Sequence, residues 1–157
     1  MKKLTVCLLI SLLALISFST MSYAASGSAI IPPYICKGTD IRTHLRVSNI
    51  TDSIITVKVT LYDHSGVVMN NIGSNLNYDY IINLNTNTTN ETFSFDLNSH
   101  STGFFTVSGF NNIEMGYGRI EWFSEEDVIH GLVANGEMVK DSLGARALFQ
   151  INQGQPF

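Results

Sequence analysis

The chain has 157 residues, a formal net charge of −4, 45% hydrophobic residues and 14% charged residues. A chain of this length suits one domain with a single hydrophobic core. Its acidic balance, without a cluster of Lys and Arg, argues against binding to nucleic acid and to anionic lipid.

The N-terminus has the pattern of a bacterial-type secretory signal peptide. Two lysines precede an apolar run over residues 4–18, and Ser22 and Ala24 suit the small positions before a cleavage site. The run is too short for a comfortable membrane span, and no second run of this kind follows. We therefore expect loss of residues 1–24, no membrane span in the mature protein, and a single domain over residues 25–157 in the periplasm or outside the cell.

The mature chain begins with an extended segment and an unpaired cysteine. Residues 29–34 contain two prolines and are expected to form a lead-in or an edge strand. Cys7 would leave with the signal peptide, so Cys36 has no partner for a disulfide within the mature chain. Two interpretations remain open: a buried thiol, which the frequent burial of free cysteine favours, and a disulfide to another chain.

The remainder is a series of short segments in which apolar and polar side chains alternate. Residues 43–49 and 55–62 are the first two, and a turn over 63–66 is expected to close a hairpin with 67–69. Further candidate strands cover 76–84, 92–97, 104–107, 114–123, 132–134 and 147–151.

The connections between these later segments carry fewer signals. Gly116 and Gly118 indicate a bulge or a close backbone approach within their strand. Residues 124–127 resemble a helix start of at most one turn, and 137–144 are expected to join the last two strands. The polar tail after residue 151 is expected to fray unless Phe157 docks.

Many short strands and the lack of a long amphipathic helix predict an all-β sandwich or barrel. The residues Ile31-Pro32-Pro33-Tyr34, an alternating strand, a turn at 49–52 and the strand 57–62 follow in order. This order resembles the sensory-rhodopsin-transducer type of small β-sandwich over the first third of the mature chain. The resemblance implies a single immunoglobulin-like antiparallel β-sandwich of about 8–10 short strands, leaves oligomer formation open, and transfers no catalytic residue.

The four histidines do not follow a metal-binding spacing, so neither a metal site nor a cofactor is expected. Aromatic residues are the stronger functional signal, because neighbouring aromatic residues in a strand point to opposite faces and one of them must lie outside the core. An exposed aromatic surface can bind sugar rings or a partner protein, whereas a covered one has only a structural role. The candidate contact residues are Tyr62, Tyr78, Tyr80, Phe104, Tyr117 and Phe123.

These patterns favour an exported, non-enzymatic binding or structural module. It would recognise a partner protein, a glycan or another copy through an aromatic-bearing sheet face. Two alternatives remain open: a subunit of a surface fibre or adhesin, which assembles by strand addition at an open sheet edge, and a small secreted hydrolase built from residues distant in sequence.

Overall fold

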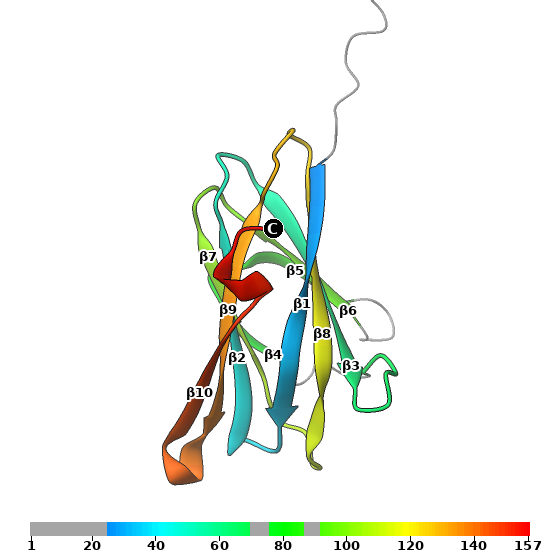
Figure 1. Ribbon diagram of the computed structural model, residues 1–157, viewed down its shortest axis with the longest axis vertical. Helices are drawn as coiled ribbons and strands as arrows, with labels where there is room; N and C mark the ends of the chain where they lie inside the picture. Colours follow the sequence, from blue (N-terminus) through cyan, green and yellow to red (C-terminus); the bar gives the residue numbers. More distant parts are fainter. Residues whose placement is uncertain (1–24, 70–75, 87–91) are drawn as a thin grey trace, which may run out of the picture.

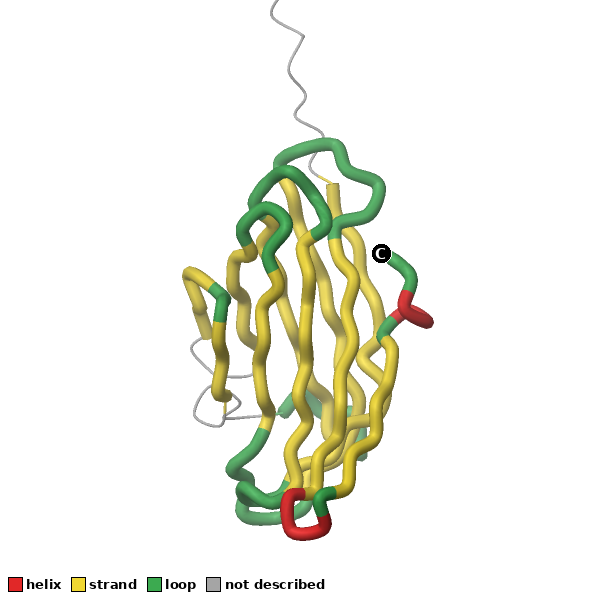
Figure 2. Tube along the Cα trace, turned by 90° about the vertical axis from the view of Figure 1, so that its left-hand side faces the viewer, coloured by secondary structure: helices red, strands yellow, loops and turns green. Residues whose placement is uncertain are grey.

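The computed structural model describes residues 25–69, 76–86 and 92–157 as two antiparallel β-sheets packed face to face, with strands along the long axis of the molecule (Figure 1, Figure 2). Sheet A has the strand order β1 (Ala25–Cys36), β8 (Glu114–Ser124), β3 (Ile55–Asp63), β6 (Thr92–Leu97), β5 (Ile82–Thr86). Sheet B has the order β10 (Ala145–Gln150), β9 (Leu132–Lys140), β2 (Ile41–Asn49), β7 (Thr102–Val107), β4 (Leu76–Asp79). The predicted all-β sandwich is confirmed. Two single 3-10 turns, η2 (Asp141–Leu143) and η3 (Asn152–Gly154), flank β10.

The core follows the alternation of the sequence. In β3 and β8, Val57 lies opposite Trp122 and Val59 lies opposite Ile120, and all four side chains are fully buried between the sheets. Burial of each such side chain stabilises the fold by about 1.5–3 kcal/mol. Residues next to them in sequence, such as Phe123, point to the outer face, as the sequence predicts.

The predicted single strand over residues 76–84 is wrong. The structure divides this segment between the two sheets, with β4 at the edge of sheet B and β5 at the edge of sheet A. Tyr80 and Asn83 have positive φ angles of 60° and 53°, and the backbone bends between the strands while Ile81 inserts into the core. Left-handed conformations at residues other than glycine leave little sequence signal, so the crossing between sheets was not evident.

The C-terminal region also differs from expectation. Residues 137–140 continue β9 instead of joining it to β10, because Gly136 and Glu137, which look like turn residues, occupy the middle of that strand. The ring of Phe149 packs so closely on Gly136 that a Cβ atom there would lie 2.3 Å from its Cζ. No helical turn forms at 124–127, because Ser124 ends β8 and the backbone bends at the next two residues.

Two further expectations are partly met. Residues 67–69 return beside β3 through a single bridge from Val68 to Tyr62, which is less than the expected strand. Phe157 docks against the start of β9, where its carbonyl oxygen accepts hydrogen bonds from the amides of Gly131 and Leu132 at 3.0 and 3.1 Å, and its side chain is buried. The tail therefore closes one end of the core.

Candidate functional site

The predicted aromatic residues do not form one surface. Tyr62, Tyr117 and Phe123 lie on the outer face of sheet A, whereas Phe104 lies on the outer face of sheet B. Tyr78 is half-exposed in edge strand β4, and Tyr80 is 84% exposed in the crossing between sheets. The outer face of sheet A thus carries three of the six, but only Tyr62 and Tyr117 are in ring contact, and Phe123 lies further along β8.

Tyr62 and Tyr117 form a cross-strand pair on sheet A. Their rings stack with centroids 4.8 Å apart and planes at 15°. Each ring covers one face of the other, which leaves an exposed strip of ring edge rather than a flat platform for a sugar. The exposed side chain of Met115 extends this apolar strip along β8, whereas the charged Arg119 and Glu121 separate it from Phe123 on the same face.

Phe104 on sheet B lies within a polar network that the sequence did not indicate. The ring of His44 stacks on it with centroids 5.3 Å apart, and the guanidinium carbon of Arg46 lies 5.6 Å from the ring centroid. Nδ1 of His44 lies 2.7 Å from Oγ1 of Thr106. Burial, and then the positive charge of Arg42, lowers the pKa of His44 and so disfavours the charged imidazolium.

Glu137 is the centre of this network. Its side chain is 8% exposed and accepts hydrogen bonds from Arg46 at 3.0 Å and from Arg146 at 3.3 Å. The hydrogen bond from Arg46 holds the pKa of the Glu137 carboxyl below its ordinary value. Because both arginines already face this carboxylate, the network is suited to holding β2, β9 and β10 together.

Replacement Glu137→Gln should remove a pH-dependent part of the stability. A carboxyl whose pKa is lower in the folded state stabilises the fold above its ordinary pKa, and this contribution is lost as the pH falls through the folded-state pKa. In urea denaturation, the difference in unfolding free energy between the wild type and the variant should therefore shrink as the pH is lowered from 7 to 3. A difference that stays constant over this range contradicts the ion-pair assignment.

Cys36 is fully buried at the end of β1. Its thiol lies 3.7 Å from the carbonyl oxygen of Glu114, and burial, followed by the charge of Glu114, raises its pKa to about 12. A protonated thiol without access to solvent is a poor nucleophile for disulfide exchange. This placement favours the buried-thiol interpretation.

The folded protein should therefore run as a single chain on a non-reducing gel after it is trapped with an alkylating reagent under denaturing conditions. A reductant-sensitive dimer band that accounts for most of the protein would show that Cys36 pairs between chains. Such a band should also disappear in a Cys36→Ser variant.

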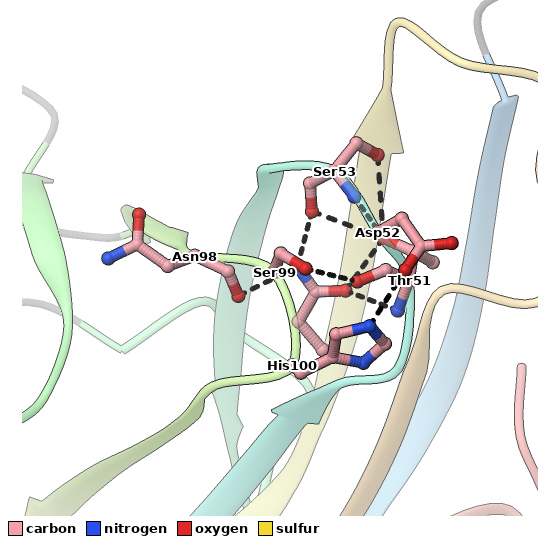
Figure 3. Close-up of polar contacts among 7 residues, drawn as sticks. Thr51, Asp52, Ser53, Asn98, Ser99 and His100 are labelled. Carbon is pink, nitrogen blue, oxygen red and sulfur yellow. Dashed lines mark hydrogen bonds and ion pairs between the residues drawn. The ribbon is translucent and has the colours of Figure 1, made fainter.

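A polar cluster joins the β2–β3 and β6–β7 turns at one end of the sandwich (Figure 3). Asn49 is buried, and its side-chain nitrogen donates to the carbonyl oxygens of Ser53, Leu97 and Asn98 at 2.7, 3.1 and 3.0 Å. Its side-chain oxygen accepts hydrogen bonds from the amide and the hydroxyl of Thr51. Asn49 therefore holds two turns that are distant in sequence.

The same cluster contains an Asp–His pair that invites comparison with catalytic machinery. Nε2 of His100 lies 2.8 Å from the carboxylate of Asp52, and both side chains are exposed. The nearby hydroxyl of Ser99 donates to the carbonyl oxygen of Thr51 (Figure 3). Among the described residues no serine hydroxyl lies within hydrogen-bond distance of His100, so the pair lacks the nucleophile that a catalytic triad needs.

The described residues also contain no group of three or more His, Cys, Asp or Glu side chains that could hold a metal ion. The same part of the chain contains no helix with the length and apolar character of a membrane span.

The sheet edges differ in how they are protected against added strands. Strand β4 has four residues, β5 has a register shift between Ile82 and Asn85, and β10 carries the charged Arg146. The second half of β1 contains Pro32 and Pro33. Short strands, irregularities, charges and prolines all hinder edge-to-edge pairing.

The first half of β1, residues 25–31, has none of these protective features. It lies at the edge of sheet A, as residues 29–34 were expected to do, it carries no charged side chain, and it pairs regularly with β8. Beside its free edge lies a hollow of about 620 Å³. Ser28, Ile30 and the charged Arg119 line it on the side of sheet A, and Gln150 and Gln153 line it on the side of the C-terminal tail. This edge is the candidate binding site.

The hydrogen-bond pattern shows which backbone groups of β1 are free. The amide of Ile35 donates to Oγ1 of Thr43 in sheet B, and the carbonyl oxygen of Ile35 accepts a hydrogen bond from the same hydroxyl. The backbone groups of Ile35 therefore face away from β8. Those of its neighbour Tyr34, which lies opposite Gly116, face toward β8. In β8, the backbone amide and carbonyl groups of Gly116 and of every second residue after it therefore face β1.

It follows that the β1 residues opposite Gly118, Ile120 and Trp122 bond to β8, and that the backbone groups of the intervening residues face the free edge. These free residues are Ser26, Ser28 and Ile30. Their amides and carbonyls have no hydrogen-bond partner within the described part of the chain. The sequence indicated an edge strand but not which of its amides are free.

No protein-family model, curated protein or solved structure matches the chain. The resemblance to the sensory-rhodopsin-transducer sandwich, and the immunoglobulin-like topology that it implies, therefore stay predictions.

Proposed function

We propose that this protein is an exported, non-enzymatic recognition module, and that it binds another protein chain by accepting an extended strand at the free edge of β1. The observation that carries this proposal is the row of free amides and carbonyls at Ser26, Ser28 and Ile30. Strand addition uses such a row directly, because each added backbone group finds a hydrogen-bond partner.

Exposed apolar side chains support the same surface. Ile30 is 58% exposed and Phe123 is 48% exposed, and both lie on the outer face of sheet A beside the free edge. Apolar side chains that flank a row of free backbone groups favour a protein partner, because an added strand can use both at once. Phe123 is the one predicted aromatic residue that this surface uses.

Export is supported by the sequence of residues 1–24, which lie outside the described residues. The fibre-subunit alternative would use the same edge, because it also depends on strand addition. For the hydrolase alternative, the described residues offer one hydroxyl–imidazole pair, Thr106 and His44, whose Oγ1 and Nδ1 lie 2.7 Å apart on sheet B, away from the free edge of β1.

Site-specific photo-crosslinking in the producing cells tests the proposal. Benzoylphenylalanine is placed at position 28, and in a control at position 143, because Leu143 is an apolar residue that is 71% exposed but lies in η2, outside the edge. We expect a defined protein adduct from position 28 and none from position 143. Equal labelling at both positions, or no adduct at position 28, would overturn the proposal, and the mass of the unlinked protein reports whether residues 1–24 are removed.

A further inference from the structure

We infer that the strand accepted by β1 is β1 of a second copy, in an antiparallel pair related by a two-fold axis at Ser28. This inference rests on the proposed function and names the partner. The two copies would join their A sheets into one continuous sheet across the edge, as in isologous dimers.

The free backbone groups are self-complementary in this register. With the axis at Ser28, Ser28 lies opposite its own counterpart, and Ser26 lies opposite Ile30 of the second copy. In an antiparallel pair, directly opposed residues exchange two hydrogen bonds when their backbone groups face each other. All three free residues face the edge, so each of them finds its full set of partners and none is left unpaired.

The side chains on the outer face are also complementary. Three side chains would lie side by side on three successive strands. They are Phe123 on β8, Ser26 opposite it on β1, and Ile30 on β1 of the second copy. The small Ser26 side chain leaves room for the exposed Phe123 ring to reach across it to the exposed Ile30. The pair thereby covers two apolar side chains that are exposed in the single chain.

Charged groups lie close to the pairing axis. Residues 25–31 carry no charged side chain, but Arg119, opposite Ile30 in β8, donates to Oγ of Ser28 at 3.4 Å, and Glu121 lies opposite Ser28. Removal of residues 1–24 would add the α-amino charge of Ala25 at the start of β1. Glu121 lies 3.8 Å from Lys58 and 3.6 Å from Arg119, so its charge is balanced within its own sheet.

The test is sedimentation of the purified mature chain over a range of concentrations, with Ser28→Pro as the blocking variant. Proline at this position removes the central donor and places its ring at the new interface, but it breaks no bond to β8, because the amide of Ser28 faces the free edge. Ser28→Thr retains the amide and is the matched control. A second blocking variant, Ile30→Lys, places a charge at the interface and keeps every backbone group.

We expect dimers of the wild type and of Ser28→Thr, and monomers of Ser28→Pro and Ile30→Lys at the concentration where the wild type is mostly dimeric. Circular dichroism checks that each variant retains the sheet spectrum. A wild type that is monomeric at every concentration, or a dimer that persists in Ile30→Lys and Ser28→Pro, would overturn the inference. A monomer that still gives a larger, heterologous adduct from position 28 in cells would overturn the second copy as partner and leave the proposed function standing.

Discussion

The Gly116→Ala variant is expected to lose about 3–5 kcal/mol of stability, a large part of the total for a domain of this size. A Cβ atom on Gly116 would lie 1.8 Å from the carbonyl oxygen of Tyr62 and 2.9 Å from the carbonyl carbon of Asp63. Both contacts are with the backbone of β3, which cannot rotate away as a side chain can. Urea denaturation should show a much lower midpoint, or no folded protein at all.

Gly144→Ala is the control for this substitution. Gly144 has a φ angle of 59°, and no atom lies within 4 Å of the position of an added Cβ. The expected cost is therefore about 1 kcal/mol, which is the conformational cost of a left-handed alanine. Equal losses in the two variants would show that β3 and β8 are not in close contact at Gly116.

The Asn49→Ala variant is expected to lose about 2–4 kcal/mol. The substitution leaves the buried carbonyl of Leu97 and the buried amide of Thr51 without the partner that Asn49 provides, and unpaired buried polar groups are costly. It also releases the carbonyl groups of Ser53 and Asn98, so the β2–β3 and β6–β7 turns should become mobile. The measurements are urea denaturation and amide exchange in both turns.

Asn98→Ala is the matched control. Asn98 belongs to the same cluster, but it contributes its backbone carbonyl oxygen, and its side chain points away from the other labelled residues (Figure 3). The expected change is within about 0.5 kcal/mol, as for most surface substitutions. A loss in this variant that equals the loss in Asn49→Ala would contradict the role given to the Asn49 side chain.

The sequence predicted the class of the fold and most of its strands because alternation is a local signal. The alternation in 55–62 and 114–123 correctly placed Val57, Ile120 and Trp122 in the core and Phe123 outside it. The proline pair in β1 correctly indicated an edge strand, and the glycine at position 116 correctly indicated a close backbone approach.

Features that depend on pairing between strands distant in sequence could not be predicted from local patterns. The crossing at Tyr80 depends on where two different sheets end, and the position of Glu137 within β9 depends on arginines from β2 and β10. The candidate site is the clearest case. The free amide of Ser28 follows from the register of β1 against β8, which the sequence of β1 does not contain.

Amide hydrogen exchange of β1, followed by NMR at a low and a high protein concentration, tests most directly whether this edge is free and self-pairing. In the monomer, the amides of Ser26, Ser28 and Ile30 should exchange rapidly, while those of Gly27 and Ala29, which bond to β8, should be protected. At high concentration the first three should also become protected. Protection of Ser28 in the monomer, or rapid exchange of all three amides at every concentration, would contradict the account.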